Sequence, residues 1–221
     1  MRGIFVTGTG TEVGKTVVAS AIARTRALVG ETVAVFKPAV SGLDDSAGAP
    51  IPADHELLRQ AARSSQAADE IAPYRYGPPV SPHLGAELAG ERIEPARLLA
   101  GARGAASAAD FLVCEGVGGF LVPLTLGYLV RDFARDLGLP VAIAAPPGLG
   151  TINHTLLTLE AVRSVGLDPV AVVLTPWPAG PSDVERSNRE AIARLGRVTV
   201  ETLAEIDLAD PDSWPPLELA A

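Results

Sequence analysis

The chain has 221 residues, of which 48% are hydrophobic and 20% are charged, and its formal net charge is −8. This composition excludes disorder of the whole chain, and an acidic chain without a basic tract excludes a general nucleic-acid binder. No apolar run reaches the ~18 residues that a membrane span needs, no signal peptide is expected before the first apolar run, and a single cysteine fits a cytoplasmic protein without structural zinc.

Short apolar runs alternate with helical segments along the chain. Strands are expected at 4–7, 32–36, 111–114, 140–145, 169–174 and 198–200, and helices at 16–29, 54–64, 94–107, 128–137, 151–165 and 182–194. Strands joined through helices form a parallel sheet, because each crossover packs on a face of it. The sequence therefore predicts one α/β domain over residues 1–221: a doubly wound, mostly parallel sheet with helices on both faces. Loops are expected at 41–52 and 72–82, and an irregular tail from about residue 208.

The first strand leads into the segment Gly8–Thr16, which reads GTGTEVGKT. A glycine-rich segment between a strand and a helix is the context of a phosphate-binding loop. Its backbone N–H groups can approach phosphate oxygens, Lys15 can reach the β- and γ-phosphates, and the Thr16 hydroxyl can ligate Mg²⁺. Gly8 stands one place early for the strict pattern, so the loop is a variant of the P-loop. A glycine-rich turn with a surface lysine is the alternative.

The second strand ends at Lys37-Pro38, and Lys15 and Lys37 are the only lysines among 18 basic residues. Lysine is a compact point charge, whereas arginine is a planar fork. Pro38 favours an extended backbone at Lys37, which directs this lysine to the ligand edge of the sheet. Two lysines and a metal ion would neutralise the charge on a transferring phosphoryl group. An ordinary surface lysine is the alternative.

Two acidic residues follow in chain order. Asp54 begins a helix after the first loop, and Glu115 ends the third strand, before Gly118 and Gly119. Magnesium sites usually combine one or two carboxylates with phosphates and waters. Thr16, Asp54 and Glu115 are therefore candidate ligands of Mg²⁺. A helix N-cap at Asp54 and a solvent-facing acid at Glu115 are the alternatives.

The helix expected at 151–165 begins with Thr151, Ile152 and Asn153, after Gly150. The free N–H groups at such a helix start would suit a carboxylate. A Thr/Asn cap without a ligand is the alternative.

Together these motifs resemble the dethiobiotin synthetase family, over most of the chain to about residue 208. The matching segments are Val6–Thr9, Thr11–Thr16, Lys37-Pro38, Ser41-Gly42, Ser81-Pro82-His83, Glu115-Gly116, Gly118-Gly119 and Gly150–His154. The resemblance implies a P-loop NTPase fold and a reaction of 7,8-diaminononanoate with CO₂ (or bicarbonate) and ATP–Mg²⁺. In that reaction a carbamate oxygen attacks the γ-phosphate, and the second amine closes the ring to give dethiobiotin, ADP and phosphate.

The resemblance also implies roles for residues. Lys37, Lys15 and Thr11 would be catalytic, and Thr16, Asp54 and Glu115 would hold Mg²⁺. The substrate would contact Ser41, Gly118, Thr151, Ile152 and Asn153, at a site shared across a homodimer interface. The nucleotide contacts would be Glu12, Val13, Gly14, Lys15, Thr16, Val17, Asp54, Glu115, Gly116, Val117, Gly118, Thr175, Pro176 and Asp207.

The sequence departs from the family where the nucleotide base would lie. Thr175-Pro176-Trp177 stands where the family commonly has Asn-Asp, and Ala204–Asp207 replaces Gly-Glu-Ile-Pro. The expected preference for ATP over other nucleotides is therefore open.

Two other classes share this loop. A cobyrinate-type amide ligase would bring a glutaminase domain, for which the chain has no room. A partition or septum-site ATPase would carry a second lysine early in the loop, where Gly10 stands, and a basic or amphipathic contact surface.

Overall fold

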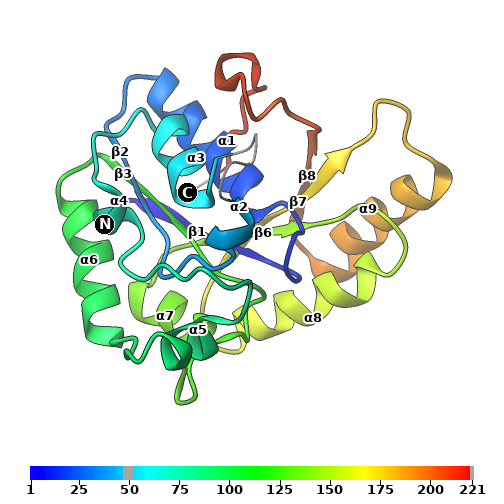
Figure 1. Cartoon of the computed structure of the whole chain (residues 1–221). Helices are drawn as coiled ribbons and strands as arrows, with labels where there is room; N and C mark the ends of the chain where they lie inside the picture. The colour runs from blue at the N-terminus through cyan, green and yellow to red at the C-terminus, as the bar shows by residue number, and fades with distance from the viewer. Residues whose placement is uncertain (47–51, 220–221) are drawn as a thin grey trace.

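The computed structural model describes residues 1–46 and 52–219, which fold around a six-stranded parallel sheet (Figure 1). Its strands stand in the order β2-β3-β1-β6-β7-β8, and all neighbouring pairs are parallel. The strands are β1 (Gly3–Gly8), β2 (Val33–Phe36), β3 (Phe111–Glu115), β6 (Val141–Ala145), β7 (Pro169–Trp177) and β8 (Thr199–Ala204). The predicted parallel α/β fold is confirmed.

Helices cover both faces of the sheet. Helices α1 (Lys15–Leu28) and α3 (Asp54–Ala61) pack on one face, and α6 (Pro95–Ser107), α7 (Val130–Leu137), α8 (Thr151–Arg163) and α9 (Asp183–Gly196) pack on the other (Figure 1). In β1, Ile4 and Val6 face α1, whereas Phe5 faces α7. A strand buried on both faces is apolar at every position, which explains its unbroken hydrophobic run. Within the two described ranges, no helix is long and apolar enough to cross a membrane.

Several short elements were not predicted. They are α2 (Leu43–Ser46), α4 (Ala68–Ile71), α5 (Pro82–Leu88), and the hairpin of β4 (Pro123–Thr125) with β5 (Tyr128–Leu129). Elements of two to seven residues are too short to show a hydrophobic period. The loop expected at 41–52 is wrong for 43–46, which is helical, and 47–51 lie outside the described residues. The loop expected at 72–82 is correct up to the start of α5.

The C-terminal segment is irregular, as expected, apart from a 3₁₀ turn at Pro211–Ser213. It nevertheless packs along α1, on the face that the red end of the chain covers in Figure 1. Trp214 and Leu217 are buried, the Leu217 N–H donates to Thr25 Oγ1 at 2.9 Å, and Asp212 pairs with Arg24. This segment is therefore held against the helix that begins at the phosphate-binding loop.

Candidate active site

The phosphate-binding loop joins β1 to α1 and closes tightly on itself. Gly14 caps α1 with φ 88°, and a Cβ there would lie 2.5 Å from Thr175 Cγ2, so only glycine fits. Glu12 also has a positive φ, of 60°. The Lys15 side chain is buried over the loop, where its Nζ donates to the Gly10 carbonyl at 2.7 Å. The predicted loop is therefore present, with its lysine turned inward to the place where phosphates would lie.

The second lysine lies between the two predicted metal-binding acids. Lys37 Nζ is 2.6 Å from Asp54 Oδ2 and 2.5 Å from Glu115 Oε1. The Thr16 hydroxyl donates to the same Glu115 oxygen at 2.9 Å. Four residues are thus brought together: Lys37 directly after β2, Glu115 at the end of β3, Asp54 in α3 and Thr16 at the start of α1. The chain separates Thr16 from Glu115 by 99 positions.

Burial and charge act against each other in this cluster. Burial disfavours the charged form of Lys37, but Glu115 and Asp54 outweigh it, so the pKa of Lys37 lies above its usual value. Lys37 in turn lowers the pKa of the Asp54 carboxyl. Burial raises the pKa of the fully buried Glu115, against the attraction of Lys37. Burial also lowers the pKa of Lys15 to about 8.

The oxygens of the cluster fit a hard divalent cation. Thr16, Asp54 and Glu115 offer one hydroxyl and two carboxylates, the donor types that Mg²⁺ takes beside phosphates and waters. Glu115 Oε2 is buried and accepts no hydrogen bond from the residues that the structure describes. A buried carboxylate oxygen without a partner is costly unless a cation or donor reaches it. Thr16, Asp54 and Glu115 would hold the ion.

A cavity of about 870 Å³ joins the loop to the cluster. It lies at the carboxyl ends of β1, β2 and β3, where open α/β sheets bind ligands. Of the predicted site residues, its lining includes Thr11, Glu12, Gly14, Lys15, Thr16, Val17, Lys37, Ser41, Asp54, Glu115, Val117 and Gly118. Sequence reasoning therefore located most of this cavity's wall.

Part of the same wall was given no role in the site, although Ser81-Pro82-His83 is one of the segments that resemble the family. Pro79, Val80, Ser81 and Pro82 line the cavity from the loop before α5, and Leu208 lines it from the segment after β8. Ser81 Oγ lies 2.9 Å from His83 Nδ1. The signal was the proline-rich loop at the ligand edge, which marks a functional segment without saying which residues face inward.

Other predicted site residues lie outside this lining. Val13 packs beside α1, Gly116 donates its N–H to the Val6 carbonyl at 2.8 Å, and Thr175 is buried against Gly14. Pro176 and Asp207 are exposed. Gly14 and Leu208 line the cavity, and Thr175 lies against Gly14 while Asp207 precedes Leu208 in the chain, so both are adjacent to the cavity.

The start of α8 does not reach the main cavity within one chain. Thr151 is buried with its hydroxyl 3.4 Å from that of Thr155, Ile152 is partly buried, and Asn153 is exposed. Further along the helix, His154 and Leu157 line a separate hollow of about 430 Å³ with Thr9, Gly119 and Leu121. This hollow and the main cavity share Val122, so they are neighbours.

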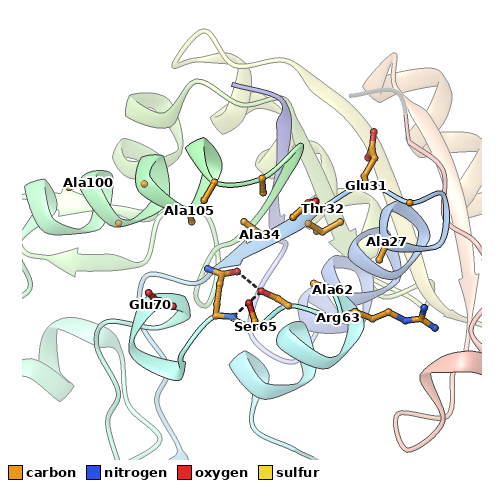
Figure 2. A pocket seen from close by; sticks show the side chains of 18 residues that line it. Ala27, Glu31, Thr32, Ala34, Ala62, Arg63, Ser65, Glu70, Ala100 and Ala105 are labelled. Atoms are coloured by element: carbon orange, nitrogen blue, oxygen red, sulfur yellow. Dashed lines mark hydrogen bonds between the residues drawn. The ribbon is translucent and has the colours of Figure 1, made fainter.

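A third cavity, of about 720 Å³, lies at the opposite end of the sheet (Figure 2). Residues at the start of β2 and the ends of α1 and α6 line it, including Thr32, Ala27 and Ala105. At its edge the Gln66 side chain pairs with the backbone N–H and C=O of Val35, at 2.8 and 3.1 Å. Both lysines of the chain lie elsewhere, so phosphate chemistry belongs to the cavity at the carboxyl ends of the strands.

Comparisons with known proteins agree with this geometry. A family model described as an AAA domain matches residues 2–213. The ATP-dependent dethiobiotin synthetase BioD of Anaeromyxobacter dehalogenans (strain 2CP-1) is 43% identical over 197 residues, which cover 88% of this chain and 86% of that protein. The protein of the same name from Bacillus subtilis (strain 168) is 36% identical over 204 residues, covering 90% and 85%.

A solved structure, the MinC:MinD cell division protein complex from Aquifex aeolicus, superposes with a TM-score of 0.60 over 93% of this chain and 82% of that chain. At 13% identity this similarity shows the fold alone.

A parallel sheet with a phosphate-binding loop between its first strand and helix defines a P-loop NTPase. Sequence identity at the level of these two relatives, over most of both chains, shows a shared family as well as a shared fold. The chain belongs to the family of ATP-dependent dethiobiotin synthetases and is an ATP-dependent ligase.

Proposed function

We propose that this enzyme makes dethiobiotin from 7,8-diaminononanoate, CO₂ (or bicarbonate) and ATP, with Mg²⁺. One amine adds to CO₂ to give a carbamate, and a carbamate oxygen attacks the γ-phosphate to form a carbamic–phosphoric anhydride and ADP. The second amine then attacks the carbonyl carbon, phosphate leaves, and the ureido ring closes. The observation that carries the proposal is the meeting of two lysines and two acids in one cavity beside the phosphate-binding loop.

The chemistry requires such a cluster because both reacting groups are anionic. Two unit charges about 4 Å apart repel by roughly 4 kcal/mol at an effective dielectric constant of 20. Lys15 and Lys37 both line the cavity and supply compact positive charges, and the backbone N–H groups of the loop add partial charge. Proton transfer by an acid–base pair is not needed for this attack. Thr11 and Glu12 line the cavity and are proposed to lie over the reacting groups.

Thr16, Asp54 and Glu115 hold Mg²⁺ in this proposal. When bound, the ion neutralises phosphate charge and orients the β- and γ-phosphates. The unpartnered Glu115 Oε2 and the three converging oxygen donors support the assignment.

The nucleotide base is proposed to lie beyond Val17, toward Thr175-Pro176 and Asp207. Leu208 and Val17 both line the cavity and pack in the same apolar cluster, which gives a base an apolar surface to stack on. Val13 to Thr16, with Val117 and Gly118, would surround the phosphates, and Gly116 positions Glu115 through its bond to β1.

The diamine is proposed to lie near Ser41 and Gly118, with its carboxylate at the start of α8 in a homodimer. Ser41 and Gly118 line the main cavity. Leu121 and Leu157 line the hollow beside α8 and are 53 and 56% exposed. Leu149, in the loop before α8, is 96% exposed. An exposed apolar group of this kind is typical of a surface that another subunit covers. A cytoplasmic location remains the expectation from the cysteine content.

A product assay tests this proposal. Purified enzyme with diaminononanoate, bicarbonate and ATP–Mg²⁺ is expected to release dethiobiotin and ADP in equal amounts, measured by mass spectrometry and a coupled ADP assay. ATP hydrolysis at the same rate without the diamine would contradict the assignment. It would favour the alternative, a partition or septum-site type ATPase, which shares the fold but makes no product from the diamine.

A further inference from the structure

The position of Lys37 has a consequence for how the site is loaded, and it rests on the proposed function. The ammonium group of Lys37 contacts one oxygen of Asp54 and one of Glu115, and Thr16 donates to that same Glu115 oxygen. These are the three side chains proposed to ligate the divalent cation. The Lys37 ammonium group is thus a cation of the protein itself that already lies among these oxygens.

The cluster also holds as many lysines as acids. Two acids, Asp54 and Glu115, face two lysines, Lys15 and Lys37, in one cavity, and Lys37 contacts both acids directly. Glu115 is fully buried, and only Asp54 of the pair is open to solvent, with 46% of its side chain exposed. A divalent ion added to two acids that already face two lysines would bring positive charge that no further acid of the cluster compensates. Phosphate groups of a nucleotide would compensate it.

The two lysines differ in what they contact. Lys15 donates to a neutral carbonyl, Gly10 O, in its own loop. Lys37 donates only to the carboxylates, among the residues that the structure describes. Loss of Lys37 would therefore remove the cation that contacts Asp54 and Glu115, whereas loss of Lys15 would leave that contact in place. This difference makes Lys15 the matched control for Lys37.

We propose that Lys37 takes the place of the divalent cation until nucleotide binds. The Lys37 ammonium group would leave Asp54 and Glu115 only when nucleotide phosphates accompany a divalent cation to these oxygens. The released group is then available to the anionic reacting oxygens. Lys37 thereby links binding to chemistry, because it becomes free only when both nucleotide and metal are present.

Manganese binding to the nucleotide-free protein tests this competition. Free Mn²⁺ is measured by electron paramagnetic resonance for the wild type, Lys37→Met and Lys15→Met, each without nucleotide and with ADP. Lys37→Met is expected to bind Mn²⁺ about tenfold more tightly than the wild type in the absence of ADP. Lys15→Met removes the same charge but no contact with the carboxylates, so it is expected to gain much less than Lys37→Met. No gain in Lys37→Met, or an equal gain in both variants, would overturn the proposal.

The wild-type protein offers a second measurement that needs no stable variant. Because the chain has two lysines, ¹³C-lysine labelling gives two side-chain Cε signals, and Lys15→Arg assigns them. Mg²⁺ alone is expected to leave the Lys37 signal in place, whereas ADP with Mg²⁺ shifts it. A shift of that signal by Mg²⁺ alone, as large as with ADP, would contradict the proposal. Neither measurement uses the diamine, so failure of dethiobiotin synthesis and failure of this inference are seen separately.

Discussion

The two ends of the proposed nucleotide site are built in different ways. At the phosphate end, a single loop of consecutive residues supplies the backbone donors and Lys15, and strand ends supply Lys37 and Glu115. At the base end, Thr175 comes from β7 and Leu208 from the segment after β8, which packing against α1 holds in place. The phosphate end depends on local sequence and charge, whereas the base end depends on contacts between distant segments.

The largest effect is expected at the phosphate end, from Lys37→Arg. The guanidinium fork keeps the charge but does not fit a position where an ammonium group contacts two carboxylates at 2.5–2.6 Å. We expect kcat to fall by about 100-fold with ADP binding largely retained, because positioning of the reacting groups is lost. Steady-state kinetics with calorimetric ADP binding measures both. A variant with full activity would remove the special role of the ammonium group.

The contact between the two ends is tested by Gly14→Ala. Gly14 has φ 88°, and the added Cβ would meet Thr175 Cγ2 at 2.5 Å, so the loop must shift. Nucleotide affinity is expected to fall by about tenfold.

Gly10→Ala is the matched control in the same loop. Its Cβ would lie 3.7 Å from Val13 Cγ1, at an ordinary packing distance. ADP titration should show little change for this variant. Equal losses in both variants would mean that the approach of Thr175 to the loop is unimportant.

The base end alone is tested by Trp214→Phe. Trp214 Nε1 donates to the Asp207 carbonyl at 2.5 Å, next to Leu208 in the cavity wall. Phenylalanine keeps an aromatic ring there but removes part of the buried indole and this bond, which is worth about 1 kcal/mol, so we expect ATP to bind about fivefold more weakly. Inorganic tripolyphosphate, which has no base, should bind as before. If tripolyphosphate binding weakens equally, the C-terminal segment acts on the whole domain and not on the base end.

The smallest effect is expected from the base itself. Thr175 is buried against Gly14, and the family's amide side chain is absent at this position. An amide side chain at this position would be left unpaired by the wrong base and would disfavour that nucleotide. Because the amide is absent, we expect the kcat/KM values for ATP, CTP and GTP to lie within about tenfold of one another. A nucleotide panel measures this directly. A preference for ATP of several orders of magnitude would show that other groups read the base.

The difference between the phosphate end and the base end explains which features could be predicted from the sequence. The sheet and the phosphate loop follow from apolar runs and from glycines and a lysine in consecutive positions. Strand ends in a parallel sheet share one edge, so Lys37 and Glu115 were each expected at that edge, whereas their direct contact was not predicted. The direct Lys37–Asp54 contact depends on how α3 packs on α1, and no spacing in the sequence encodes it.

The contacts of the C-terminal segment could not be predicted from the sequence either. Its prolines predict an irregular chain, but burial of Trp214 and Leu217 on α1 arises from packing between residues nearly 200 positions apart. Leu208 was for this reason not predicted to line the cavity. The start of α8 was predicted as a helix start, and its proposed contact with substrate requires a second subunit.

Transfer of isotopic oxygen from bicarbonate tests the central claim most directly, because Lys15 and Lys37 are proposed to bring a carbamate oxygen against the γ-phosphate. The reaction is run with ¹⁸O-bicarbonate, the diamine and unlabelled ATP, fast enough to limit exchange with water, and the released phosphate is analysed by mass spectrometry. The account predicts that phosphate carries an oxygen from bicarbonate and that its formation matches that of dethiobiotin. Unlabelled phosphate released alongside dethiobiotin would contradict it.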